Sequence, residues 1–224
     1  MKLGFIGFGE VGFEISRGLK EEGLGGIIAF DPQARDPKHG KAVQERAKEA
    51  GVRLVETGAD VERQADVINA AVPGSRALQA ALDVVPELTG GKIYLDVSTS
   101  SAPTKKKIAE AVQAKKAGFV DGAMMGALSL NRHKVPTLVS GAASDELIRL
   151  LTPYHMSLEK VSDIPGDAIS VKLVRSIYMK GMASLAVEML DAATKLQVEE
   201  LVLKSVSSTL NAAPFEETLD WLMP

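Results

Sequence analysis

Short apolar runs alternate with longer stretches of mixed polarity along the first two thirds of the chain. Each run is bounded by glycine, proline or charged residues, which is typical of strands in a buried sheet. The first five runs cover residues 3–6, 27–30, 52–55, 65–72 and 92–96. Amphipathic stretches between them predict helices after Gly12, over 38–50 and over 76–84. Alternation of this kind predicts a parallel sheet with helices on both faces.

The same alternation continues to about residue 164. It predicts three more strands and a short helix, at 118–126, 134–140, 158–161 and 145–151. Pro136 indicates a sheet edge or a strand start, because proline cannot donate to a strand ladder. Ser75 is expected to cap the helix over 76–84, and Ser101 to cap a helix that starts near Pro103.

Residues 167–196 contain no helix breaker except Gly181 and predict one helix about 45 Å long. Apolar residues lie nearly all round it, so we expect most of its faces to be buried. Its polar exceptions form one stripe of residues four apart: Lys172, Ser176, Lys180, Ser184 and Glu188. Only about thirty residues follow, in helices predicted at 198–210 and 214–222. We therefore expect a homodimer in which a second subunit covers part of this helix. The predicted domains are 1–164 and 165–224.

Three glycines after the first strand have the spacing of a dinucleotide-binding turn. Gly7 allows a tight turn, Gly9 lets a pyrophosphate approach the backbone, and Gly12 lets helix and strand pack closely. The helix N-terminus then offers free N–H groups to the phosphates. The predicted cofactor residues are Gly7, Phe8, Gly9, Glu10, Val11 and Gly12. The alternative is a glycine-rich turn without a ligand.

These features together predict the fold class. It is α/β, a Rossmann-type, doubly wound and mostly parallel sheet followed by a small all-α C-terminal region with one long helix.

Asp31 ends the second strand, nineteen residues after Gly12. An acidic residue near this distance accepts the adenosine ribose hydroxyls of NAD, and its charge repels the extra phosphate of NADP. Arg35 lies four residues on and could pair with that phosphate. Asp31 is also a favourable turn residue before Pro32. The sequence is compatible with either NAD or NADP as the coenzyme, and Asp31 favours NAD.

Ligands of such sheets bind beyond the carboxyl ends of the strands. This rule points to Ala71, Val72 and Pro73 after one strand and to Val97, Ser98 and Thr99 after another. Of these, Ala71, Val72, Pro73 and Ser98 join the predicted cofactor residues. Ser98, Thr99 and Ser100 can also bind a substrate carboxylate or hydroxyl, whereas Ser101 is the natural helix cap.

Composition narrows the class of function. The 224 residues are 46% hydrophobic and 25% charged, which is ordinary for a globular protein, and the net charge is −3. The absence of cysteine excludes disulfides and thiolate chemistry, and no metal site is expected. With no signal peptide and no membrane span in the pattern, we expect a cytoplasmic protein. Lys105, Lys106 and Lys107 are expected to form a solvated helix face, and we expect no nucleic-acid or membrane partner.

These stretches together resemble the β-hydroxyacid dehydrogenase family, which holds 3-hydroxyisobutyrate dehydrogenase and the 6-phosphogluconate dehydrogenases. The resemblance rests on the glycine turn, on Asp96-Val-Ser-Thr-Ser-Ser-Ala-Pro103, on Phe119-Val-Asp-Gly-Ala-Met-Met-Gly-Ala127 and on Gly166-Asp-Ala-Ile-Ser-Val-Lys172. It implies an NAD(P)-dependent oxidoreductase that transfers a hydride between a nicotinamide and a 3-hydroxy acid, or its semialdehyde or keto form.

The resemblance also implies roles for single residues. Lys172 would be the catalytic proton relay, with its pKa lowered by burial among Ile169, Val171 and Leu173. The substrate would be held by Ser98, Thr99, Ser100, Gly122, Gly126 and Ser176. Arg175 or Lys180 would pair with an acid group of the substrate.

The chain departs from the family pattern at several positions. Met125 stands where the family's turn has serine, Ala168 replaces a glycine, and Ser176 replaces an asparagine. The helical region after the long helix is also short. These departures indicate a divergent branch and leave two alternatives: a non-catalytic NAD(P)-binding protein, and a reductase of C=N bonds such as a pyrroline-carboxylate or imine reductase.

Overall fold

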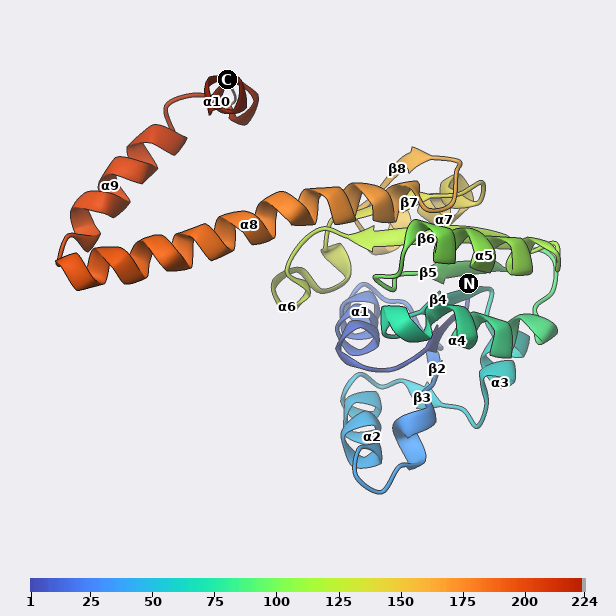
Figure 1. The fold of residues 1–224 in the computed structure, drawn as a ribbon. Coiled ribbons are helices and arrows are strands. Elements are labelled where there is room, and N and C mark those ends of the chain that lie inside the picture. The colour runs from blue at the N-terminus through green and yellow to red at the C-terminus, as the bar shows by residue number, and fades with distance from the viewer. Residues whose placement is uncertain (223–224) are drawn as a thin grey trace. The chain divides into compact units, whose positions relative to one another are not determined.

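The computed structural model describes residues 1–222 and contains one eight-stranded sheet (Figure 1). The strand order is β3-β2-β1-β4-β5-β6-β7-β8. All neighbours pair in parallel except β6 and β7, which are antiparallel. The strands are β1 Leu3–Ile6, β2 Ile28–Phe30, β3 Arg53–Leu54, β4 Val67–Ala70, β5 Ile93–Asp96, β6 Gly118–Met124, β7 Thr137–Ser140 and β8 Leu158–Ser162. The predicted doubly wound, mostly parallel sheet is confirmed.

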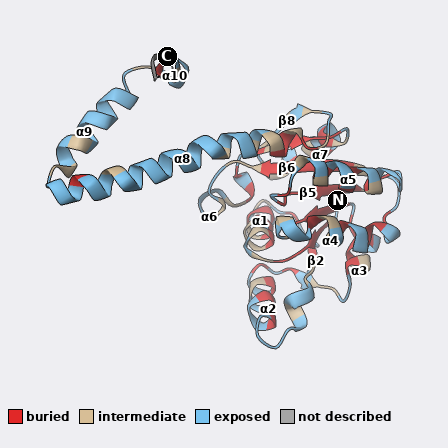
Figure 2. Ribbon diagram, in the orientation of Figure 1, coloured by how far each residue is buried: buried red, intermediate tan, exposed pale blue. Residues whose placement is uncertain are grey.

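Helices cover both faces of this sheet because the strands bury side chains on both sides. Leu3 and Phe5 of β1 belong to one core, which receives Ile15 and Leu19 from α1. Ile6 belongs to the second core. The helices of the first core are α1 Glu10–Glu21, α2 Gly40–Glu49 and α7 Ser144–Leu151, and those of the second are α3 Gly58–Gln64, α4 Ala77–Val84 and α5 Ala102–Gln113. Figure 2 shows the resulting concentration of buried residues in and beside the strands.

The chain after β8 is helical, as the sequence predicts. It forms α8 Asp167–Leu196, α9 Glu199–Leu210 and α10 Phe215–Leu222. Met1–Leu173 is one compact unit and a second begins at Val174, so this division falls within α8. The predicted boundary at 164/165 stays a prediction. Within the second unit, the rings of Tyr178 and Phe215 pack edge to face with centroids 5.2 Å apart.

Most large apolar side chains of α8 are exposed, contrary to the buried faces expected from their distribution (Figure 2). Examples are Val174, Ile177, Leu185 and Val187, each more than 60% exposed. Within residues 1–222, no helix combines the length and the apolarity that crossing a bilayer requires.

Two local predictions are wrong, and two short helices were missed. Ser75 lies in a 3-10 turn, Gly74–Arg76, and α4 begins after Arg76 with no side-chain cap. Lys105 does not belong to a solvated face: its side chain is fully buried, whereas Lys106 and Lys107 are exposed. Finally, α3 and the short helix α6 Leu128–Asn131 were not predicted, because each is too brief to show a helical period.

Candidate functional site

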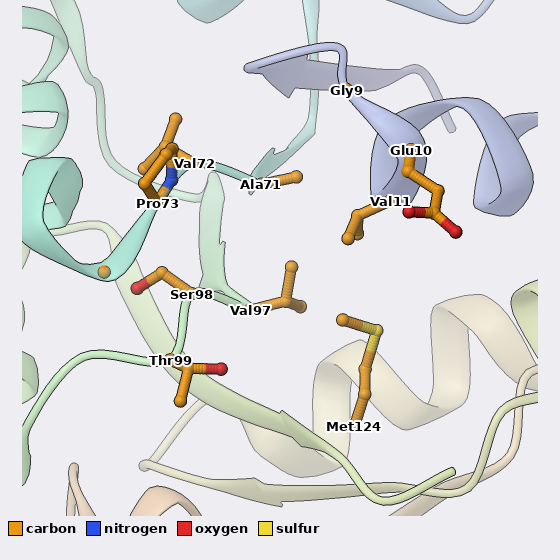
Figure 3. Close-up of a pocket in the computed structure, with 11 residues that line it drawn as sticks. Gly9, Glu10, Val11, Ala71, Val72, Pro73, Val97, Ser98, Thr99 and Met124 are labelled. Atoms are coloured by element: carbon orange, nitrogen blue, oxygen red, sulfur yellow. The ribbon is translucent and has the colours of Figure 1, made fainter. Parts of the chain in front are cut away.

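A cavity of about 360 Å³ opens at the carboxyl ends of β1, β4, β5 and β6 (Figure 3). This is the switch point of the sheet: β1 and β4 are paired, and the next strands, β2 after β1 and β5 after β4, lie on opposite sides of that pair. Its lining residues are Gly9, Glu10, Val11, Ala71, Val72, Pro73, Gly74, Val97, Ser98, Thr99 and Met124. Figure 3 shows the side chains of Val11, Val97 and Met124 converging on one side of the cavity, which gives it an apolar wall.

The backbone of the glycine turn disfavours a residue with a side chain at Gly7. Gly7 has φ +85°, and a Cβ there would lie 2.5 Å from the backbone oxygen of Ala71. At Gly9 a Cβ would meet nothing within 4 Å, so the backbone is open on this side. At Gly12 a Cβ would lie 3.0 Å from the Phe8 ring, so the first turns of α1 pack closely against the glycine turn itself.

The N-terminus of α1 borders the same cavity. Gly9 is the N-cap and supplies no side-chain hydrogen bond to the first turn. The Phe8 side chain is buried, and its N–H is donated to Asp31 rather than to the cavity. Uncapped N–H groups at a helix N-terminus, with open space before them, fit the phosphates of a dinucleotide.

Asp31 connects the end of β2 to the glycine turn. Its carboxylate accepts the N–H of Phe8 at 2.7 Å and the N–H of Gln33 at 2.8 Å. The second of these bonds caps the 3-10 turn Pro32–Arg35, which is the turn role that the sequence left open. A carboxylate has about four lone-pair sites, so two remain for ribose hydroxyls. Arg35 forms an exposed ion pair with Glu56.

The loop after β5 carries the predicted hydroxyls. Ser98 and Ser100 are buried, and their hydroxyls lie 3.4 Å apart. Thr99 between them is exposed. Ser101 caps α5 through the N–H of Thr104, as predicted.

Lys172 lies on the first turns of α8, within the unit that contains the cavity. Its Nζ donates to Thr99 Oγ1 at 3.3 Å. The pKa of Lys172 is lowered, first by burial and then by the charge of Lys105, while Asp121 acts in the opposite sense. Of the three apolar residues expected around Lys172, Ile169 is fully buried, whereas Val171 is 44% and Leu173 40% exposed.

Other predicted residues do not line the cavity. Gly122 is buried in β6, where a Cβ would lie 3.0 Å from Leu95 and Val97. Gly126 is exposed beyond the end of β6. Ser176, Arg175 and Lys180 belong to the second unit, and their contacts to a substrate stay predictions.

Comparison with known proteins identifies the fold and its family. Residues 2–152 match the family described as the NAD binding domain of 6-phosphogluconate dehydrogenase. The chain belongs to this family. The resemblance seen in the sequence is therefore confirmed.

Relatives of the NAD-binding domain include enzymes. Human mitochondrial 3-hydroxyisobutyrate dehydrogenase is 28% identical over 148 residues, which cover 64% of this chain and 42% of that protein. A conserved hypothetical protein from Sinorhizobium meliloti is 32% identical, with a TM-score of 0.77 over 97% of this chain and 72% of that one. An imine reductase from Myxococcus stipitatus, solved with NADP⁺, is 18% identical with a TM-score of 0.75 over 94% of this chain and 76% of its own. This last likeness concerns the fold alone.

Two residues of the site escaped sequence reasoning. Gly74 brings the loop after β4 against the serine loop, since a Cβ there would lie 2.2 Å from the Thr99 backbone oxygen. In the sequence, the turn dipeptide Pro73-Gly74 was the feature that could have indicated Gly74. Met124 completes the apolar wall of the NAD-binding domain's cavity, and only the pairing of β5 with β6 brings it there.

Proposed function

We propose that this protein is an NAD(P)-dependent oxidoreductase that acts on the CH–OH group of a 3-hydroxy acid, or on the matching semialdehyde or keto acid. The observation that carries the proposal is the contact between Lys172 Nζ and Thr99 Oγ1, because Thr99 also lines the cavity beside the glycine turn. The amine of Lys172 is thus one hydrogen bond away from a residue that lines the cavity beside the glycine turn.

Lys172 is suited to relay the proton of the reacting hydroxyl. Its lowered pKa increases the fraction of neutral amine near neutral pH, which a general base requires. When bound, the nicotinamide supplies the hydride acceptor or donor. The hydroxyl of Thr99 can donate a hydrogen bond to a substrate carboxylate, and the apolar wall that includes Val97 excludes water from the reacting carbon.

NAD is the coenzyme that the charges favour. Asp31 directs a carboxylate to the end of β2, where the adenosine ribose of a dinucleotide would lie. Arg35, the cation nearest in sequence, is neutralised by its pairing with Glu56. A 2′-phosphate would therefore meet two carboxylates and one arginine.

The alternatives predict different outcomes. A non-catalytic protein would bind a nicotinamide cofactor without turnover of any hydroxy acid. A C=N reductase would turn over cyclic imines instead. The lysine–threonine pair argues against the second alternative.

The first test is a fluorescence titration of the protein with NADH and NADPH, followed by a screen of 3-hydroxy acids. We expect micromolar binding and turnover in the wild type, and binding without turnover in Lys172→Ala. Lys106→Ala, an exposed lysine elsewhere in the first unit, is the matched control and keeps both. Wild-type turnover in Lys172→Ala would exclude the proposed role, and turnover of imines alone would favour the C=N reductase.

We also propose that two copies of the chain pair through α8. The exposed apolar side chains on this helix, including Ile177, Leu185 and Val187, need a cover that residues 1–222 do not supply. Light scattering coupled to gel filtration should give twice the mass of one chain. A monomer at micromolar concentration would contradict this.

A further inference from the structure

A lysine is fully buried beside the proposed site, on a helix that the sequence predicted to be solvated. Lys105 lies on the first turns of α5, and its side chain is 0% exposed. Burying an ammonium group costs several kcal/mol unless it is paired and hydrogen-bonded. A buried ion pair is also often no more stable than apolar packing of the same volume. Stability alone therefore gives no reason for a lysine at this position.

The ammonium of Lys105 joins the two central strands. Its Nζ lies 3.1 Å from Asp96 Oδ2 on β5 and 3.1 Å from Asp121 Oδ1 on β6. It also donates to the backbone oxygen of Asp96 at 2.6 Å. Both carboxylates are 1% exposed or less. The three groups carry a net charge of −1 and have almost no contact with solvent.

The second carboxylate oxygen of Asp121, Oδ2, binds the start of α8. Asp121 Oδ2 accepts the N–H of Ile169 at 2.9 Å and the hydroxyl of Ser140 at 3.4 Å. The Ser140 hydroxyl in turn accepts the N–H of Ala168 at 3.1 Å. Two of the otherwise unpaired N–H groups at this helix N-terminus are therefore bound to the network around Lys105. Lys172 lies one helical turn further along α8 and on the same side as Ala168.

The other carboxylate holds the serine loop. Asp96 Oδ1 accepts the N–H of Ser98 at 2.9 Å. Ser98 directly precedes Thr99, whose hydroxyl accepts the hydrogen bond from Lys172. Lys105 therefore joins the segment that positions Lys172 to the segment that positions its partner.

We propose that Lys105 is a positioning residue of the oxidoreductase, which holds Thr99 and the first turn of α8 together so that Lys172 faces the cofactor cavity. The proposal rests on the proposed function for its catalytic meaning and on the contacts above for its geometry. It assigns the bridging charge, rather than the volume of the side chain, as the necessary property.

The charge of Lys105 also acts on Lys172 through space. The charged groups of neighbouring elements that act on Lys172 are Lys105 on α5 and Asp121 on β6. Lys105 is itself paired with Asp96 of β5 and with Asp121. Asp167, on the first turn of α8, is bound to the hydroxyl of Ser162 at 2.7 Å. Lys105 lowers the pKa of Lys172, so its loss should raise that pKa.

The test measures Lys172 directly and requires no substrate. Reductive methylation of the full chain over a range of pH, read by peptide mass spectrometry, gives the titration of Lys172 in each variant. Lys105→Met keeps most of the volume and removes the charge. We expect the Lys172 midpoint to rise, because Lys105 is a like charge that lowers the pKa of Lys172. Lys106→Met, the exposed neighbour, should leave the midpoint unchanged.

A second variant guards against loss of folding. Lys105→Met leaves two buried carboxylates facing one another, whereas Lys105→Met combined with Asp96→Asn restores the net charge of −1 without the bridge. We expect this double variant to be folded by circular dichroism and to show the raised Lys172 midpoint. An unchanged Lys172 midpoint in a folded variant of either kind overturns the proposal.

Turnover separates this inference from the proposed function. If the wild type oxidises a hydroxy acid, Lys105→Met should lower kcat by about tenfold or more while the Kd for NADH changes less than about twofold. If the Lys172 midpoint shifts but the wild type turns over no hydroxy acid, the positioning role of Lys105 is supported and the proposed oxidoreductase function is refuted. If the wild type turns over a hydroxy acid but the Lys172 midpoint does not shift in the Lys105 variants, the oxidoreductase function stands and the positioning role is refuted.

Discussion

A buried glutamate far from the proposed site should make the stability of the protein depend on pH. Glu62 on α3 is 0% exposed, and among the described residues neither of its carboxylate oxygens has a hydrogen-bond partner. Burial raises the pKa of Glu62 to about 8 from an ordinary value of 4.5. The charge of Lys92 opposes this rise and that of Glu87 adds to it. The ammonium of Lys92 is bound to the backbone oxygens of Glu62 and Ala65 rather than to the carboxylate.

The sign of the effect follows from proton binding. Between pH 4.5 and about 8 the folded protein keeps a proton on Glu62 that the unfolded chain releases. The free energy of unfolding therefore falls as the pH rises, by about 1.4 kcal/mol per pH unit across this window. From pH 5 to pH 8 the loss amounts to about 3 kcal/mol, which is a large part of the stability of an ordinary domain.

Glu62→Gln removes the titrating group and keeps the shape of the side chain. The free energy of unfolding of Glu62→Gln minus that of the wild type should increase by about 3 kcal/mol between pH 5 and pH 8. Urea unfolding followed by circular dichroism measures both proteins, and the difference cancels the other titrating groups. Glu110→Gln, at an exposed position of α5, is the matched control and should give a flat difference. A flat difference for Glu62→Gln as well would refute the reasoning, since it would mean that Glu62 is solvated when ionised.

Four further predictions concern the turn, the coenzyme and acid stability. Gly7→Ala should lower the free energy of unfolding by about 1–3 kcal/mol because of its positive φ, measured by urea unfolding. Gly9→Ala should change stability by less than about 0.5 kcal/mol, yet weaken NADH binding by about tenfold in a fluorescence titration, because its Cβ enters open space beside the helix N-terminus. Glu56→Gln should release Arg35 and shift the ratio of NADH to NADPH affinity toward NADPH; an unchanged ratio would show that this pair plays no part in coenzyme choice. The pKa of Glu22 is lowered to about 2, first by its hydrogen bond with Lys134 and then by that with His155. The stability advantage of the wild type over Glu22→Gln should therefore be full above pH 4.5 and disappear as the pH falls toward 2 in acid unfolding curves.

Several features of the molecule could be predicted from sequence because their cause is local. The strand β1 ends where Gly7 permits the turn, and the helix α8 has the predicted bounds because no breaker interrupts it. Parallel strands and the glycine turn together predict where a ligand binds, since the carboxyl ends of such strands share one edge of the sheet. The cavity at the switch point contains eight of the predicted site residues for this reason.

The polarity of neighbouring residues predicts the exposure of a charged side chain wrongly where the groups that surround that side chain are distant in sequence. Lys105 looks solvated beside Lys106 and Lys107, but its carboxylate partners lie on two strands that precede and follow α5. Glu62 belongs to a short helix, and it is the packing of that helix against the sheet that removes it from water. No helical or strand period carries information of this kind, because it depends on which elements are neighbours.

The sequence by itself therefore determined the doubly wound sheet, the dinucleotide turn and the long helix with Lys172. Each follows from backbone preference and from the apolar pattern over a few residues. Only the tertiary structure decided which charges are buried, how Arg35 is paired and which threonine Lys172 contacts. Electrostatic interactions act across space in a medium of low polarity, so their strength is set by the packing of elements far apart in the chain.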